Sequence, residues 1–282
     1  MVFNGMYYLL NAKCPHLCNG CFLDSQMSYS ARNSDQAIRD LTQLKEDWKK
    51  IRVTGSNVLR FLKIEEILKL CEQDYILGDV FTIKRDKERL ERLKESGLKR
   101  VFITSSYSDN VTKKVSLEEA SKAIKKLGLE LAISYIMTHN NKGEVANMVE
   151  EAISVNANSM RFMRYLPTDE KPNSLNLTDD EERELIDKIY KLRSEIPKDK
   201  IKIFIHGHFG TKFRPSKGPI CFAGEEMFFI GLDNLVYPCE FLINPNNVMG
   251  KFFEGKVKID RKLCGYENDE CKLLQMHSGR KR

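Results

Sequence analysis

The sequence lacks the long apolar segments of a protein that crosses a membrane. No part of its 282 residues approaches the ~18 consecutive apolar residues of a membrane-spanning helix. No basic-then-apolar leader with a small-residue cleavage site precedes the first cysteine, so the sequence shows no secretory signal. We therefore expect a cytoplasmic protein, in a compartment where thiols stay reduced.

The sequence also has little excess charge, no internal repeat and no low-complexity tract. Its 46 Lys and Arg and 40 Asp and Glu give a net charge of +6, and the two signs are mixed along the chain. Mixed charge is typical of a solvated surface, whereas a nucleic-acid-binding protein gathers basic residues on one face. Together these absences argue against membrane and nucleic-acid partners. The 41% of hydrophobic residues suffices to bury a large core.

Short apolar segments alternate with amphipathic ones through the first two thirds of the chain. Strands alternating with helices at this pitch favour a parallel sheet with right-handed crossovers. Six such units are too few to close an eightfold barrel, so we expect an α/β fold with an open, partial (β/α)6 barrel of the TIM type. The predicted strands are 6–11, 50–54, 75–83, 100–105, 129–137 and 158–165.

Capping signals and hydrophobic spacing place the helices between these strands. Ser34 is predicted to cap the first helix, and Ser116 and Thr178 each begin a capping box with a glutamate three residues later. Cys71 shares the apolar face of the second helix, which predicts a core residue and not a functional thiol.

The pattern changes near Pro197, where helical periodicity weakens. A Gly- and Pro-rich stretch at 207–219 is followed by short strands and turns. We predict one domain over 1–200 and a small hairpin-containing, cysteine-rich domain over 201–282.

Three cysteines directly follow the first predicted strand. Cys14, Cys18 and Cys21 are separated by three and two residues. Three thiolates on one loop can hold three irons of a cubane cluster and leave the fourth iron open, whereas a closed zinc site needs a fourth ligand nearby. A structural zinc knuckle with His16 as that ligand is the alternative interpretation.

This cysteine spacing and its position resemble the radical S-adenosylmethionine (radical SAM) superfamily. Members commonly carry a Gly-Gly-Glu-Pro motif after the second strand, which receives the amino group of the cofactor; Gly55, Ser56, Asn57 and Val58 occupy that place here. Asn57 offers a carbonyl oxygen instead of a carboxylate, so the charge-assisted part of that contact is absent. The resemblance implies a [4Fe–4S] cluster on the three cysteines and S-adenosylmethionine bound to it.

The same resemblance implies cofactor contacts at the ends of later strands. Ser105 and Ser134 are the candidate polar contacts on the fourth and fifth strands. Arg161 and Arg164 lie on the sixth strand, and Arg164 is our candidate to bind a carboxylate because a guanidinium suits bidentate contacts. The alternative is that these are ordinary polar residues at strand ends.

A second group of four cysteines lies beyond residue 200: Cys221, Cys239, Cys264 and Cys271. Residues 228–238 predict a β-hairpin with an Asp-Asn turn that leads to Cys239. A hairpin followed by cysteines resembles the twitch or SPASM modules of radical SAM enzymes, which implies one auxiliary [4Fe–4S] cluster. A four-cysteine zinc site is the alternative. His206 and His208 share one side of a predicted strand. We expect them to be solvated or bonded to backbone; the alternative is that they line the active site or bind a metal.

The resemblance implies reductive cleavage of S-adenosylmethionine to a 5′-deoxyadenosyl radical, which abstracts hydrogen from a substrate. We expect a radical SAM oxidoreductase or maturase that oxidises or cross-links a ribosomal peptide or protein side chain. The alternatives are a small-molecule dehydrogenase or cyclase, acting on an amino sugar or in cofactor biosynthesis, and a non-catalytic iron–sulfur protein. Expected partners are a flavodoxin- or ferredoxin-type reductant and a separate leader-peptide-binding protein, since the first strand starts about six residues into the chain.

Overall fold

The structure is a computed structural model, and its described residues form two compact units. It describes residues 5–13, 21, 23–78, 80–105, 111–166, 173–205, 223–261, 266–267 and 270–271. The first unit comprises Met1–Asp74, Leu166–Lys171 and Lys217–Arg282, and the second comprises Tyr75–Tyr165 and Pro172–Ser216. We call them the terminal unit and the middle unit, after the parts of the chain that form them. The predicted division at residue 200 stays a prediction.

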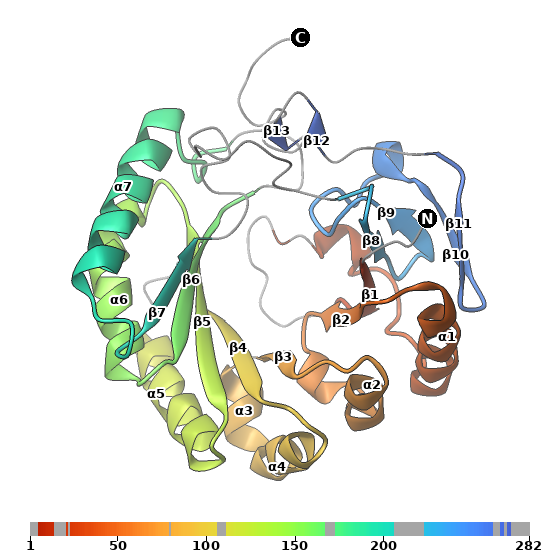
Figure 1. Cartoon of the computed structure of the whole chain (residues 1–282), viewed down its shortest axis with the longest axis horizontal. Coiled ribbons are helices and arrows are strands. Elements are labelled where there is room, and N and C mark those ends of the chain that lie inside the picture. The colour runs from red at the N-terminus through yellow and green to blue at the C-terminus, as the bar shows by residue number, and fades with distance from the viewer. Residues whose placement is uncertain are drawn as a thin grey trace. The chain divides into compact units, whose positions relative to one another are not determined.

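The terminal unit is built on a six-stranded mixed sheet in the order β11-β10-β9-β8-β1-β2 (Figure 1). Strand β1 lies between β2 and β8 and runs parallel to both, whereas β8, β9, β10 and β11 are each antiparallel to the next strand in the sheet. Its elements are β1 (Gly5–Asn11), η1 (Asp24–Gln26), α1 (Ser34–Asp47), β2 (Ile51–Gly55), η2 (Val58–Arg60), α2 (Ile64–Leu70), β8 (Met227–Ile230), β9 (Leu235–Tyr237), η4 (Pro245–Asn247), β10 (Gly250–Phe253), β11 (Lys256–Ile259), β12 (Tyr266–Glu267) and β13 (Glu270–Cys271).

Strand β1 is the buried centre of this sheet. Met6, Tyr8, Leu9 and Leu10 are fully buried, a nearly continuous apolar run of the kind found where both faces of a parallel strand are covered. Helix α1 contributes the apolar face predicted from its spacing, although its N-cap is Asn33 and not Ser34. The Asn33 side chain accepts hydrogen bonds from the backbone N–H groups of Asp35 and Gln36.

The predicted C-terminal hairpin is present and is an integral part of this sheet. Strands β8 and β9 are joined by the turn Gly231–Asn234, in which Asn234 has a positive φ of 60°. Strand β8 pairs with β1 in register, with Gly5 opposite Met227 and Tyr8 opposite Ile230. Strand β1, which leads into the first cysteine group, is therefore paired with a strand more than two hundred positions later in the chain.

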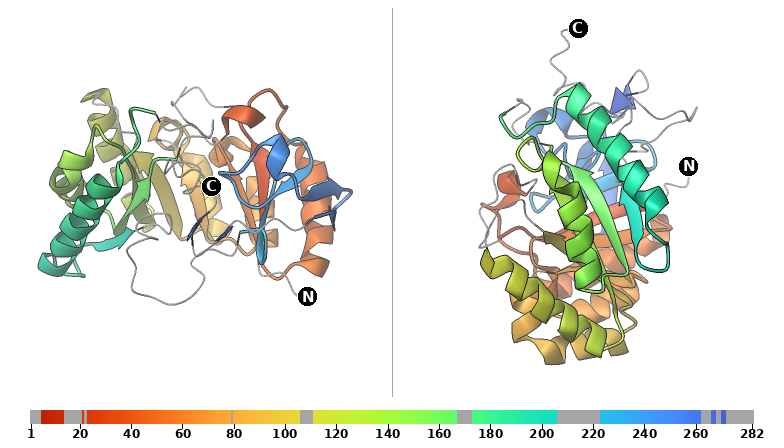
Figure 2. Two further views of the ribbon diagram at one scale, coloured as in Figure 1. Left: turned by 90° about the horizontal axis from the view of Figure 1, so that it is seen from above. Right: turned by 90° about the vertical axis from the view of Figure 1, so that its left-hand side faces the viewer.

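The middle unit is an all-parallel sheet in the order β3-β4-β5-β6-β7. Helices α4, α5, α6 and α7 lie along one face of it, as the two further views in Figure 2 also show. Its elements are β3 (Tyr75–Gly78), α3 (Val80–Arg85), α4 (Lys87–Glu95), β4 (Arg100–Ser105), α5 (Val111–Lys126), β5 (Glu130–Met137), η3 (Lys142–Glu144), α6 (Val145–Ser154), β6 (Ser159–Arg164), α7 (Asp179–Glu195) and β7 (Lys202–Ile205).

Most predicted elements are confirmed, with two corrections in the middle unit. The segment 75–83 is not one strand, because β3 ends at Gly78 and a short helix begins at Val80. Ser116 does not cap its helix, because α5 already begins at Val111 and places that residue in its second turn. The capping box of Thr178 and Glu181 is present as predicted.

The fold class is confirmed as α/β with parallel strands and covering helices. The described strands form two separate main sheets and no closed barrel. Among the described residues, no helix is both long enough and apolar enough to span a membrane.

Candidate functional site

The carboxyl ends of β1 and β2 in the terminal unit form the first part of the candidate site. Strand β1 ends at Asn11, and Cys14 follows three residues later; β2 ends at Gly55, and its turn continues through Ser56 and Asn57. Because β1 and β2 are parallel neighbours, with Asn11 opposite Gly55, both segments leave the same end of the sheet.

Asn11 ties these two segments together. Its side-chain oxygen accepts a hydrogen bond from the backbone N–H of Asn57 at 3.3 Å, and its amide nitrogen donates to the Asn57 carbonyl oxygen at 3.1 Å. Its own carbonyl oxygen accepts the Ser56 N–H at 3.2 Å. The Ser56 hydroxyl lies 2.7 Å from the carbonyl oxygen of Lys13, to which it donates. The base of the cysteine loop and the predicted cofactor turn are thus one hydrogen-bonded structure.

Gly55 is required by this close approach. A Cβ atom at residue 55 would lie 2.4 Å from the side-chain oxygen of Asn11 and 2.9 Å from its carbonyl oxygen. The sequence indicated a glycine whose backbone can approach a ligand. The structure shows that the same glycine also makes room for Asn11.

The segment that follows the cysteine loop is held by the turn of the C-terminal hairpin. Gln26 is buried, accepts the N–H of Leu232 at 2.6 Å and donates to the carboxylate of Asp233 at 3.0 Å. Arg32 donates to the carbonyl oxygens of Leu9 at 2.8 Å and Gly231 at 2.5 Å. Polar side chains therefore connect both flanks of the cysteine loop to fixed strands.

Aromatic rings and a carboxylate surround the Arg32 guanidinium. It lies 4.2 Å from the centroid of the Tyr8 ring, which is a cation–π contact. The Tyr8 hydroxyl in turn donates to Asp40 at 2.7 Å. Burial lowers the pKa of Arg32, and the neighbouring Tyr8, Asp40 and Asp233 oppose that shift. Burial also raises the pKa of Tyr8, which stays protonated.

Of the three N-terminal cysteines, Cys21 lies within the described residues, and Cys14 and Cys18 lie outside them. Cys21 is partly buried and packs against a group of apolar residues that we call the hairpin cluster. This cluster consists of Leu9, Ala12, Leu23, Phe229, Leu232, Tyr237 and Ile243. Cys21 therefore packs against apolar residues of both β1 and the hairpin.

Of the four later cysteines, Cys239 is the one whose side chain is described. It is buried with Leu166, Ala223 and Leu242, and Leu242 is followed directly by Ile243 of the hairpin cluster. Cys271 is in β13, where the backbone alone is described, and Cys221 and Cys264 lie outside the described residues, as do His206 and His208. Cys71 is a core residue as predicted, and burial raises the pKa of its thiol to about 12.

The strands of the middle unit place the predicted polar residues on two opposite faces. Ser134 and Arg161 are direct neighbours on β5 and β6. Arg161 donates from Nε to the Ser134 hydroxyl at 2.6 Å, and its guanidinium lies 4.7 Å from the Phe102 ring centroid. Ser105 ends β4, where its backbone alone is described.

Arg164 lies on the other face, against the helices. Side chains alternate along a strand, so Arg164 shares a face with Phe162 and not with Arg161. Its Nη1 lies 2.6 Å from a carboxylate oxygen of Glu182 on α7, and both side chains are almost fully buried. The guanidinium that we selected as a carboxylate ligand therefore has a carboxylate partner within the protein.

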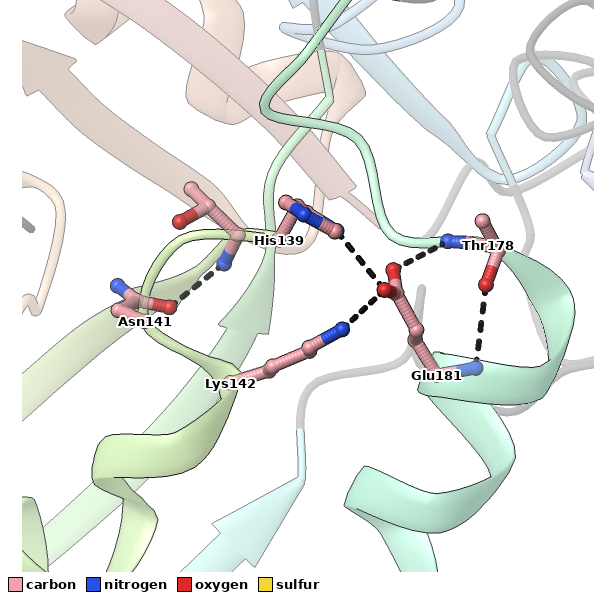
Figure 3. A network of polar contacts seen from close by, with 6 residues as sticks. His139, Asn141, Lys142, Thr178 and Glu181 are labelled. Atoms are coloured by element: carbon pink, nitrogen blue, oxygen red, sulfur yellow. Dashed lines mark hydrogen bonds and ion pairs between the residues drawn. The ribbon is translucent and has the colours of Figure 1, made fainter.

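The carboxyl end of β5 carries a second polar network, drawn in Figure 3. Nδ1 of His139 lies 2.8 Å from Oε1 of Glu181, and Lys142 contacts the same oxygen. The other oxygen of Glu181 accepts the backbone N–H of Thr178 at 3.0 Å, as part of the capping box of α7. Sequence reasoning identified the capping box but not the histidine, because the contact joins two elements far apart in the chain.

The donor set at the end of β1 fits an iron–sulfur cluster. Among the described residues there is no group of three or more His, Cys, Asp or Glu side chains that could hold a metal ion. The cysteine loop instead supplies thiolates, the soft ligands that iron–sulfur clusters use. Cys21, the described member of this loop, keeps part of its surface exposed.

Structural comparison finds solved structures that share the fold of this chain. It matches Streptococcus suis SuiB bound to the precursor peptide SuiA at a TM-score of 0.68 and 15% identity, over 99% of this chain and 65% of SuiB. SuiB bound to S-adenosylmethionine gives a TM-score of 0.68 at 14% identity, over 92% and 63%. The enzyme anSMEcpe with bound AdoMet and the Cp18Cys peptide gives 0.66 at 15% identity, over 99% and 84%.

At 14 to 15% identity these matches show a shared fold, as the resemblance carried by the cysteines led us to expect. The chain spans about 60 to 65% of the length of SuiB. No protein-family model matches the sequence, and comparison with curated proteins gives no match.

Proposed function

We propose that the protein is a radical SAM enzyme that oxidises or cross-links a side chain of a peptide or protein. One observation carries the proposal: Asn11 joins the strand that leads into the cysteine loop to the Gly55–Asn57 turn. The two segments that the resemblance assigns to the cluster and to its cofactor are thereby held at one end of one sheet. The fold is shared with enzymes whose structures contain S-adenosylmethionine and peptides.

Cys14, Cys18 and Cys21 would hold the [4Fe–4S] cluster, and the turn after β2 would receive the amino group of S-adenosylmethionine. When bound, these groups supply a one-electron cleavage that yields a 5′-deoxyadenosyl radical for hydrogen abstraction from the substrate. The protein contributes position: Gly55 brings backbone close, and Asn11 fixes the carbonyl oxygen and N–H of Asn57. Ser56 donates to Lys13 and holds the loop base.

In the middle unit, Arg161 is a better candidate than Arg164 for an anionic group of the cofactor or substrate. Arg161 and Ser134 lie on the sheet face away from the helices, and Phe102 supports the guanidinium. Arg164 already forms a buried ion pair with Glu182. Ser105, at the carboxyl end of β4, remains a candidate contact to the cofactor.

Cys221, Cys239, Cys264 and Cys271 would hold one auxiliary [4Fe–4S] cluster, with a role as electron acceptor or relay. The burial of Cys239 among Leu166, Ala223 and Leu242 supports a ligand shielded from water. The same four cysteines could instead form a zinc site, which metal analysis separates from a cluster.

A peptide substrate is supported by the neighbours, which contain SuiA and the Cp18Cys peptide. The proposal includes a flavodoxin- or ferredoxin-type reductant and a separate protein that binds a leader peptide.

A small-molecule dehydrogenase or cyclase is the second candidate, since the hairpin module would serve it equally well. Asn57 in place of a glutamate is the observation that favours a non-catalytic iron–sulfur protein.

Anaerobic reconstitution tests the proposal. Two clusters give about 8 irons and about 8 sulfides per chain, and the reduced protein should convert S-adenosylmethionine to 5′-deoxyadenosine. Cys18→Ala should lose one cluster and all cleavage, whereas the matched control Cys71→Ala should keep both, because that thiol is a core residue. If the wild-type protein forms no more 5′-deoxyadenosine than Cys18→Ala, both enzyme candidates are wrong.

Substrate class is tested with the same preparation. A precursor peptide encoded beside this gene should lose the mass of two hydrogens, or gain an internal cross-link, in the presence of S-adenosylmethionine and reductant. An unmodified peptide alongside oxidation of an amino sugar would favour the small-molecule candidate.

A further inference from the structure

The pair His139 and Glu181 has the geometry of an oriented proton acceptor. Nδ1 of His139 lies 2.8 Å from Oε1 of Glu181, and half of the histidine side chain is exposed. When Nδ1 carries the proton and donates it to a carboxylate, Nε2 presents a lone pair to its surroundings. No described residue forms a hydrogen bond or ion pair with Nε2.

The position of His139 is fixed by its backbone. Its N–H donates to the carbonyl oxygen of Leu175 at 2.9 Å. Asn141 closes the turn around it. Its side-chain oxygen accepts the Thr138 N–H at 2.8 Å (Figure 3), and its amide donates to the Ile136 carbonyl oxygen at 2.9 Å. The ring therefore does not depend on its contact with Glu181 alone for its place.

Glu181 stays ionised across the whole working range of pH. Partial desolvation raises its pKa, but hydrogen bonds from Lys142, from the Thr178 backbone and from His139 outweigh that effect and bring the pKa to about 2. A carboxylate held in this way selects the tautomer and orientation of a neighbouring imidazole. Two further charged groups lie near this turn: Glu144, which accepts from Asn147, and Lys188 of α7, which donates to the Gly143 carbonyl oxygen.

The location is the one where a parallel sheet binds substrates. His139 follows β5 by two residues, and ligands of open α/β sheets bind beyond the carboxyl ends of the strands. Within the described residues, the Thr138 hydroxyl and the Asn176 amide nitrogen are buried beside this turn without a hydrogen-bond partner. Buried polar atoms of this kind are satisfied by water or by a ligand.

We propose that His139 is a general base that takes a proton from an N–H, O–H or S–H group of the substrate, with Glu181 as its positioning residue. The heteroatom–hydrogen bond breaks, the electron pair stays on the heteroatom, and the new N–H bond forms at Nε2. The exposed imidazolium then releases the proton to water. The inference rests on the proposed function, because oxidation of a carbon–heteroatom bond removes hydrogen from both atoms. It narrows the substrate to a side chain or backbone group with such a proton.

The test measures 5′-deoxyadenosine and modified substrate separately in the reconstituted enzyme. His139→Gln should keep cofactor cleavage and lose roughly 10²- to 10⁴-fold in product formation, the usual contribution of a general base. His139→Ala should recover product formation when imidazole is added. Glu181→Gln should give a smaller loss and a shifted pH profile, while its capping box persists because Gln also serves at that position.

Glu144→Gln is the matched control, since it removes the same charge from the same turn outside the pair and should leave product formation and pH profile unchanged. A second readout needs no cofactor. Diethyl pyrocarbonate should modify His139 of the full chain faster in the wild type than in Glu181→Gln, because the carboxylate holds the proton on Nδ1 and so leaves the lone pair on Nε2.

Product formation in His139→Gln at the wild-type level, with the pH profile unchanged, would overturn the inference while the proposed function stands. A wild-type protein that cleaves no S-adenosylmethionine would instead overturn the proposed function. In that case the rate of modification still tests whether Glu181 positions His139. Equal rates in the wild type and Glu181→Gln would overturn that role, and a slower rate in the variant would support it.

Discussion

The side chain of Asn11 forms two hydrogen bonds with the backbone of a single residue, Asn57, accepting its N–H and donating to its carbonyl oxygen. A side-chain amide can pair with a peptide group in this way because it offers one donor and one acceptor in the same plane. The contact fixes the turn after β2 against the last residues before the cysteine loop. It makes Asn11, which is neither a cysteine nor part of the cofactor motif, central to the candidate site.

Asn11→Ala should weaken cofactor binding and destabilise the terminal unit. The change removes both hydrogen bonds to Asn57, and leaving partly buried partners unsatisfied costs about 1–3 kcal/mol. We expect the dissociation constant for S-adenosylmethionine to rise about tenfold, the equivalent of 1.4 kcal/mol. Titration of the reconstituted protein measures this. Asn147→Ala removes an exposed amide on α6 and should change neither quantity; an equal effect of both variants would contradict the assignment.

Gly55→Ala should destabilise the terminal unit more than alanine does at a glycine with open space around it. The new Cβ would lie 2.4 Å and 2.9 Å from two oxygens of Asn11, and overpacking of this kind costs about 1–3 kcal/mol. In Gly143→Ala the Cβ meets nothing within 4 Å, so this control should unfold at the wild-type denaturant concentration. The double variant Asn11→Ala with Gly55→Ala should recover part of the loss, because the side-chain clash goes and the backbone clash stays.

Arg164→Met should destabilise the middle unit, since it leaves Glu182 charged and buried. Breaking one partner of a buried ion pair costs about 3–5 kcal/mol, whereas replacing both by apolar residues is close to neutral. Arg164→Met with Glu182→Leu should therefore restore stability in denaturant unfolding.

The same double variant decides between the two arginines as ligands. If the only role of Arg164 is its ion pair with Glu182, the double variant should bind S-adenosylmethionine and substrate as the wild type does. Arg161→Met should instead weaken the binding of one of the two. Loss of binding in the double variant with none in Arg161→Met would restore Arg164 as the ligand.

Glu181 should make a pH-dependent contribution to stability. Its folded-state pKa of about 2 lies below the ordinary value of 4.5, so the folded state favours the carboxylate. The stabilisation is complete above about pH 4.5 and is lost as the pH falls towards 2. The difference in unfolding free energy between the wild type and Glu181→Gln should accordingly be constant near neutrality and shrink below pH 4.5. A difference that grows on acidification would contradict this assignment.

Local signals in the sequence were sufficient for most of the fold. The apolar run of β1, the spacing of α1 and the Thr178 capping box all depend on residues near one another in the chain, and all are present. The prediction that Ser116 caps its helix was wrong for a physical reason. A capping box adds only modest stability, and α5 extends past Ser116 towards the N-terminus and begins at Val111.

Contacts between distant segments could not be inferred in this way. Nothing in the local sequence of Arg32 points to the Gly231 carbonyl oxygen, because the contact exists only once β8 has paired with β1. The alternation of side chains along β6 is a local signal that separates Arg164 from Arg161. Met160, Phe162 and Arg164 share the buried face of that strand, so parity already indicated which arginine would meet the helices.

The pairing of β1 with β8 sets an order for synthesis. Gly5 leaves the ribosome roughly 220 residues before its partner Met227, a delay on the order of 10–40 s at ordinary elongation rates. The whole middle unit emerges in that interval and can fold first. Until β8 arrives, one edge of β1 is bare and Cys21 has no hairpin to pack against, so the proposed iron–sulfur cluster would be assembled on the finished chain. A chain that stops short of β8 would present an open apolar strand edge, a template for aggregation.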